Sequence, residues 1–86
     1  MENHHVPIED EIDLHSFLPK EIAAVVDEFI AAAARSGLRE VRLVHGRGRG
    51  VQRGIVQAVL DAHPCVVEFW DDPLSHLGAT IARLAT

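Results

Sequence analysis

An apolar stripe with helical spacing between residues 20 and 36 constrains the fold of this chain more than any other feature. The stripe consists of Ile22, Val25, Val26, Phe29, Ile30 and Ala33. Offsets of three and four residues put these side chains on one side of a helix, which must then pack against a flat apolar surface. Pro19 suits the first position of that helix, and Gly37 suits the position just after its end. The sequence therefore predicts a helix that covers a sheet.

The remaining patterns predict the other elements of a small mixed domain. Strands are expected over residues 12–15, 41–45, 65–70 and 79–84, with a second helix over residues 51–62 and a loop over 71–78. The order β-α-β-α-β-β predicts an α/β fold of the α+β two-layer sandwich type. Two helices would cover one face of a four-stranded mixed sheet, and the short loop makes the last two strands antiparallel.

The alternation within these strands predicts a polar open face and a functional edge. Asp13, His15, Arg42 and Glu68 fall on the positions that point away from the helices. Because parallel strands bring their carboxyl ends to one edge of a sheet, His15 and His45 are expected there together. The loop around His76 is a third candidate for this edge, although spacing alone does not fix its position.

Length and composition predict one globular domain. The 86 residues divide into a polar leader, residues 1–10, and a single domain, residues 11–86. The chain has no long apolar run and no signal-peptide pattern at its start, so we expect no membrane association and a cytoplasmic location. Its single cysteine, Cys65, excludes an internal disulfide.

The basic residues are concentrated in one quarter of an acidic chain. The net charge of −5 argues against a protein that coats nucleic acid by bulk electrostatics. Six of the eight basic residues, however, are arginines between residues 35 and 53. They are Arg35, Arg39, Arg42, Arg47, Arg49 and Arg53. The guanidinium group of arginine can donate two hydrogen bonds to the oxygens of one phosphate. A solvated helix end and turn would also explain the cluster.

The segment from His45 to Gly50, with the sequence HGRGRG, has the composition of an anion-binding turn. Its glycines tolerate positive φ, so that successive N–H groups can point into one concavity beside the positive end of the next helix. The spacing matches neither a dinucleotide fingerprint nor a Walker loop. We therefore predict no nucleotide cofactor, while a phosphodiester remains possible. The alternative is a tight turn that needs its glycines only for turning.

His15 and His45 are the candidate acid and base for cleaving a phosphodiester. Imidazole exchanges protons near neutral pH, Asp13 is placed to support His15, and Arg47 and Arg49 would stabilise charge on the phosphate. A structural role is the alternative for each histidine. A metal site made of Asp13, His15, His45 and His76 has no diagnostic spacing, so no metal is predicted and metal dependence is left open.

At these residues the sequence resembles the Smr (small MutS-related) domain family. The family has an L-D-L-H-G-like first strand, a strand that ends in H/T-G-x-G, and a closing G-A-T-V-V-x-L strand. The corresponding segments are residues 12–16 (IDLHS), 45–48 (HGRG) and 78–84 (GATIARL). The match spans about residues 9–84. Ser16 departs from the usual glycine, and Gly78 alone remains of a glycine-rich approach to the last strand.

The resemblance implies a fold similar to the C-terminal domain of a bacterial initiation factor. It also implies binding to DNA or RNA, in several relatives a nicking or RNA-cleaving endonuclease activity, and a link to suppressing recombination. Asp13, His15, His45, Gly46 and Gly48 carry over as the functional edge. Together with the residue chemistry, the full expected phosphate-binding set is Gly46, Arg47, Gly48, Arg49, Gly50, Arg53, Gly78 and Thr80.

The leading hypothesis is thus a structure-directed endonuclease acting on branched or single-stranded DNA or RNA. Its oligomeric state is left open, with a monomer compatible with the sequence. One alternative is a module that binds nucleic acid or protein through the same edge without catalysis. The other, favoured by the negative charge, is an interaction domain with no nucleic-acid role.

Overall fold

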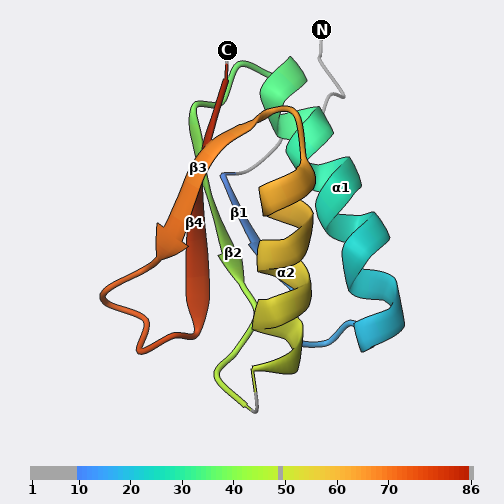
Figure 1. The fold of residues 1–86 in the computed structure, drawn as a ribbon, viewed down its shortest axis with the longest axis vertical. Helices are drawn as coiled ribbons and strands as arrows, with labels where there is room; N and C mark the ends of the chain where they lie inside the picture. Colours follow the sequence, from blue (N-terminus) through green and yellow to red (C-terminus); the bar gives the residue numbers. More distant parts are fainter. Residues whose placement is uncertain (1–9, 49, 86) are drawn as a thin grey trace, which may run out of the picture.

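The fold is a four-stranded mixed sheet with two helices packed on one face (Figure 1). The computed structural model describes residues 10–48 and 50–85, and residues 1–9, most of the predicted leader, lie outside this part. Along the chain the elements are β1 (Glu11–Asp13), α1 (Pro19–Arg35), β2 (Glu40–Val44), α2 (Val51–Ala62), β3 (Val66–Asp71) and β4 (Ala79–Leu84). The predicted fold class and element order are confirmed.

The strand order β1-β2-β4-β3 places the last strand between β2 and β3. β1 and β2 are parallel, and β4 runs antiparallel to both of its neighbours. β1, β2 and β3 therefore point the same way, and their carboxyl ends share one edge of the sheet. In Figure 1 this edge is the lower end of the molecule, where the segment between β2 and α2 and the loop between β3 and β4 both lie.

The helix stripes and the inward faces of the strands form the core. α1 buries Ile22, Val26, Ile30 and Ala33, while α2 buries Val56 and Leu60. The strands contribute Val41, Leu43, Ala82 and Leu84, and Leu14 from the segment after β1 is fully buried. Burial of this apolar surface is the main favourable term in the folding of the domain.

Both ends of α1 form as its sequence predicts. Pro19 is the first residue of α1, and the Glu21 carboxylate accepts a hydrogen bond of 2.8 Å from the Leu18 N–H. After the helix, Gly37 has φ +83°, and the Leu38 N–H donates to the Ala33 carbonyl at 3.1 Å. This left-handed glycine reverses the chain toward β2.

The predicted strands differ from the observed ones at their ends. β1 ends at Asp13 rather than His15, because the chain turns there, although the Leu14 N–H still donates to the Val44 carbonyl at 2.7 Å. β3 begins at Val66 rather than Cys65, and its register shifts between Val66 and Glu68. The ranges predicted for α2 and β4 are confirmed.

The face of the sheet away from the helices is polar and charged. Arg42 lies opposite Glu11 in the register of β1 and β2, and its Nη1 donates to the Glu11 carboxylate at 3.1 Å. Glu68 lies opposite Arg83 and accepts from its Nε at 2.7 Å. The predicted orientation of Arg42 and Glu68 is therefore confirmed. Phe69, the residue after Glu68 in β3, packs against the core.

Candidate functional site

A groove of about 350 Å³ opens at the edge where the parallel strands end. It lies between the segment that follows β1, the turn that follows β2, and the beginnings of both helices. Its lining residues are His15, Pro19, His45, Gly46, Arg47, Gly48, Gly50, Val51 and Gln52. Two of the three predicted catalytic residues, His15 and His45, thus contribute to one groove beside the glycine turn.

His15, which lines the groove, forms an exposed pair with Asp13. The His15 Nδ1 lies 2.5 Å from the Asp13 Oδ1, and the same oxygen accepts the His15 backbone N–H at 3.0 Å. The hydrogen bond from the His15 ring lowers the pKa of the Asp13 carboxyl below its ordinary value. The His15 side chain is 70% exposed. Because Nδ1 is paired with Asp13, Nε2 is the ring nitrogen through which His15 can exchange a proton with a substrate.

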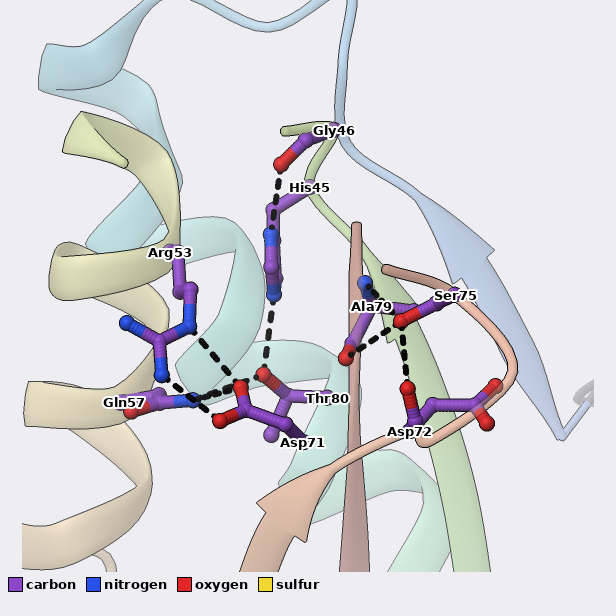
Figure 2. Close-up of polar contacts among 9 residues, drawn as sticks. All are labelled: His45, Gly46, Arg53, Gln57, Asp71, Asp72, Ser75, Ala79 and Thr80. Atoms are coloured by element: carbon purple, nitrogen blue, oxygen red, sulfur yellow. Dashed lines mark hydrogen bonds and ion pairs between the residues drawn. The ribbon is translucent and has the colours of Figure 1, made fainter. Parts of the chain in front are cut away.

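His45 has very different surroundings. The residue is only 3% exposed, and both of its ring nitrogens have protein partners (Figure 2). Nδ1 lies 3.0 Å from the Gly46 carbonyl oxygen, and Nε2 lies 2.9 Å from the Thr80 Oγ1. A carbonyl oxygen only accepts, so Nδ1 carries a proton, and in the neutral form of the ring Nε2 accepts from the Thr80 hydroxyl. Both ring nitrogens of His45 are thus engaged within the protein, and its role as an acid or base stays a prediction.

The hydrogen bonds continue from Thr80 to the end of β3 (Figure 2). The Gln57 Nε2 donates to the Thr80 Oγ1 at 3.1 Å and to the Asp71 Oδ1 at 3.0 Å. Arg53 donates two hydrogen bonds to the Asp71 carboxylate, from Nε at 2.8 Å and from Nη2 at 2.7 Å. This bidentate pair lowers the pKa of the Asp71 carboxyl. Side chains from α2, β3 and β4 therefore hold the His45 ring in one orientation.

The glycine turn uses several of its own backbone groups within the fold. Gly46, with φ +82°, donates its N–H to the Gly78 carbonyl at 2.9 Å, and Gly50, with φ +80°, donates to the Arg47 carbonyl at 3.2 Å. These two amides are therefore not free to hold an anion, contrary to the prediction. Arg47 and Gly48 are exposed on the turn, whereas Arg49 lies outside the described residues.

Three predicted phosphate ligands have internal roles instead. Thr80 is fully buried between His45 and Gln57, and Arg53 is held by Asp71. Gly78 is buried, its carbonyl accepts the N–H groups of His45 and Gly46, and its own N–H donates to the Ser75 carbonyl. Thr80 and Gly78 thus shape the edge from within, and Arg53 is engaged by Asp71 through its Nε and Nη2 atoms.

The described arginines of the sequence cluster, which exclude Arg49, do not form one basic surface. Arg42 on the open face pairs with Asp72, whose Oδ2 accepts from the Arg42 Nε at 2.7 Å. Arg35 ends α1 and Arg39 precedes β2, which puts both at the opposite end of the sheet. Of the predicted cluster, Arg47 is the described arginine that lines the groove.

Sequence reasoning missed the residues that support the edge from within. Asp71 and Asp72 end β3 and follow it, Gln57 lies on α2, and Ser75 closes the next loop. One available signal was the pair of acids at the end of a strand that runs parallel to β1 and β2. The partners of these acids lie up to 30 residues away in the sequence, as in the pair Arg42–Asp72, so spacing did not reveal them.

Two further features concern metal binding and membrane insertion in the described part of the chain. Among residues 10–48 and 50–85, no three His, Cys, Asp or Glu side chains gather to hold a metal ion, so Asp13, His15, His45 and His76 do not form a four-residue site. Neither α1 nor α2, the helices in these ranges, has the length and apolar character needed to cross a membrane.

We expect acid to destabilise the protein through its paired aspartates. The Asp71 pKa is lowered in the folded state, so the pair with Arg53 contributes stability above the ordinary Asp pKa of about 4. This contribution is lost as the pH falls through the lower, folded-state value. Melting curves followed by circular dichroism should show Asp71→Asn melting below the wild type at pH 7. The two melting temperatures should converge toward pH 2, and a constant gap at all pH values would contradict this linkage.

The fold and this edge define a two-layer α/β domain whose candidate site lies where parallel strands end. Residues 12–84 match the sequence model of the Smr domain. The chain belongs to the Smr domain family.

Several relatives support this assignment. Endonuclease MutS2 of Thermomicrobium roseum is 36% identical over 80 residues, which cover 90% of this chain and 10% of the relative. Endonuclease MutS2 of Helicobacter pylori is 33% identical over 70 residues, or 81% of this chain and 9% of the relative. The chain thus spans about a tenth of the length of these curated relatives.

Two crystal structures have the same fold. The Smr domain of Thermus thermophilus MutS2 superimposes with a TM-score of 0.85 at 30% identity, covering 91% of this chain and all of that chain. YdaL, a stand-alone small MutS-related protein from Escherichia coli, has a TM-score of 0.84 at 26% identity, covering 93% of this chain and 67% of that chain. These matches bear out the family and the fold.

Proposed function

We propose that this domain binds DNA or RNA in the groove beside the glycine turn and cleaves a phosphodiester there. The observation that carries the proposal is the exposed His15–Asp13 pair at the groove that Arg47 also lines. A proton-transfer group and a guanidinium at one groove are the parts that phosphodiester cleavage requires. The relatives named as endonucleases support the same reading. A role in DNA repair or recombination belongs to this proposal.

In this mechanism His15 is the residue that moves protons. Its Nε2 takes a proton from the attacking oxygen, which is a water or, in RNA, a 2′-hydroxyl, or supplies one to the leaving oxygen. Asp13 holds the ring through Nδ1 and stabilises the imidazolium that forms. Arg47 contacts the phosphate and stabilises the charge that develops on it.

His45 acts as a positioning residue in this proposal. Its Nδ1–H holds the carbonyl of Gly46, and its backbone N–H is bonded to the Gly78 carbonyl at 3.0 Å. These bonds fix the start of the turn that carries Arg47. A substitution at His45 should therefore disturb binding and folding as well as cleavage.

A second candidate is a binding module that uses this groove without cleaving. It is favoured by the locked His45, which leaves one accessible histidine at the groove instead of the predicted two. Incubation of the purified protein with branched, nicked and single-stranded DNA and RNA, with and without a chelator, separates the candidates. Cleavage products support the endonuclease, whereas binding without products supports the module.

Replacing Arg47 tests whether the groove holds phosphate. We expect Arg47→Ala to weaken nucleic-acid binding and to lower the slope of log affinity against log salt by about one, the value for one lost phosphate contact. Fluorescence anisotropy at several salt concentrations measures both quantities. Arg39→Ala is the matched control, because it removes the same charge at the opposite end of the sheet. Equal losses in the two variants would contradict a phosphate contact at the turn.

A further inference from the structure

Exposed apolar side chains gather at the end of the molecule that holds the groove. Leu18 precedes α1, Val51 begins α2, and Leu74 and Leu77 belong to the loop between β3 and β4. Leu74 is 88% exposed and Leu77 is 53% exposed. Single exposed leucines are common on protein surfaces, so their position carries more information than their number. Of the four, Val51 lines the groove together with Arg47, and Leu77 directly precedes Gly78, which is bonded to the glycine turn.

The loop that carries Leu74 and Leu77 is closed by hydrogen bonds at its base. The Ser75 hydroxyl donates to the Asp72 carbonyl at 2.7 Å and accepts the Ala79 N–H at 3.1 Å (Figure 2). The Asp72 N–H donates to the Ala79 carbonyl at 3.0 Å. The two leucines are therefore presented by an ordered scaffold, which reduces the entropy lost when they bind something.

The same loop is bonded directly to the glycine turn. The Gly78 carbonyl accepts the N–H groups of His45, at 3.0 Å, and Gly46, at 2.9 Å. A Cβ added at Gly78 would lie 3.3 Å from the Arg47 Cγ. Leu77 thus adjoins a residue that packs against the Arg47 side chain, and the loop and the turn form one surface.

The backbone holds Leu77 in a conformation that leucine disfavours. His76 has φ +52° and Leu77 has φ +69°, so two successive residues with side chains are left-handed. This conformation costs about 1 kcal/mol or more for each residue. Exposed apolar side chains on disfavoured backbone do not stabilise the fold, and such strain concentrates where proteins contact ligands.

We propose that Leu77, assisted by Leu74, is an apolar wedge that enters an unstacked base step beside the phosphate held by Arg47. Nucleic-acid-binding proteins combine basic contacts to the backbone with leucine side chains inserted between bases. Insertion is easiest where bases are unpaired or poorly stacked, so the favoured partner contains such a step rather than a continuous duplex. This inference rests on the proposed nucleic-acid binding. It adds that the domain selects nucleic acid that contains an unpaired or poorly stacked base step.

The test compares a continuous duplex with the same duplex carrying a short bulge, each with 2-aminopurine beside the bulge position, in DNA and in RNA. The fluorescence of 2-aminopurine rises when the base unstacks. We expect the protein to bind the bulged probe more tightly and to raise its fluorescence. Leu77→Asn keeps a residue that tolerates positive φ but removes the apolar side chain. It should abolish the fluorescence rise and weaken binding to the bulge roughly fivefold to tenfold, leaving affinity for the continuous duplex unchanged.

Two more variants complete the test. Leu74→Ser should give a smaller loss of the same kind, at a residue whose φ is not left-handed. Val67→Thr is the matched control, because Val67 is also 53% exposed but lies near the start of β3, at the other end of that strand. It should behave as the wild type.

If Leu77→Asn and Leu74→Ser also behave as the wild type, the leucines contact something else, such as a protein partner, and the wedge proposal is wrong. A wild type that binds neither probe at low salt would instead overturn the proposed function itself.

Discussion

His15→Ala should reduce phosphodiester cleavage by about 10²- to 10⁴-fold, the usual contribution of a positioned acid or base. The expected loss is large because His15 is the accessible histidine of the groove and its Nδ1 is already held by Asp13. The His15 side chain is exposed, so the variant should keep the far-ultraviolet circular dichroism and melting temperature of the wild type. Binding of uncleaved nucleic acid should change by no more than about twofold, because Arg47 remains in place.

His76→Asn is the control for this substitution. His76 is an exposed histidine in the loop at the same end of the molecule, and asparagine tolerates its positive φ. It should cleave as the wild type does, while Asp13→Asn should give a smaller loss than His15→Ala. Cleavage at the wild-type rate by His15→Ala would show that His15 is not the proton-transfer group.

Thr80→Val should give the largest loss of stability among single substitutions at the polar site. Valine nearly matches threonine in shape but removes the hydroxyl that bonds both His45 and Gln57 in a fully buried position. A buried polar group left without its partner costs about 1–3 kcal/mol. In a domain of this size, where each kcal/mol shifts the melting temperature by about 4–8 °C, it should fall by roughly 4–24 °C. Thermal unfolding followed by circular dichroism measures this change.

Thr80→Ser separates the role of the hydroxyl from that of the methyl group. Serine retains the oxygen between His45 and Gln57, so most of the stability should return. Nucleic-acid affinity should follow the same order, because the His45 ring fixes the turn that carries Arg47. A valine variant as stable as the wild type, or a serine variant as unstable as valine, would contradict this role of the hydrogen bonds.

The fold was predictable from the sequence because its main determinants are local. The apolar stripe of α1, Pro19 at its start and Gly37 after its end act within a few residues of one another. The strand ends were less accurate because they depend on partners. β1 stops at Asp13, whose carboxylate bonds to His15, and β3 shifts register against β4 near Glu68. Neither event leaves a periodic pattern in the sequence.

The site was predictable in its location but only partly in its chemistry. Parallel strand ends brought His15, His45 and the glycine turn to one groove, as the strand order implied. The different surroundings of the two histidines were not predictable, because the partner of the His45 Nε2 lies 35 residues away, at Thr80. Similarly, Arg53 resembled a phosphate ligand until the fold placed Asp71 beside it.

The central position of β4 affects how the chain folds during its synthesis. β4 is the last of the four strands of this sheet to be made, yet β2 and β3 each pair with it. While the ribosome is still adding residues 79–84, β3 has no strand to pair with and one edge of β2 is open. Open strand edges are the parts of a nascent chain that aggregate or require a chaperone. We therefore expect the sheet to be completed only after its final strand has emerged from the ribosome.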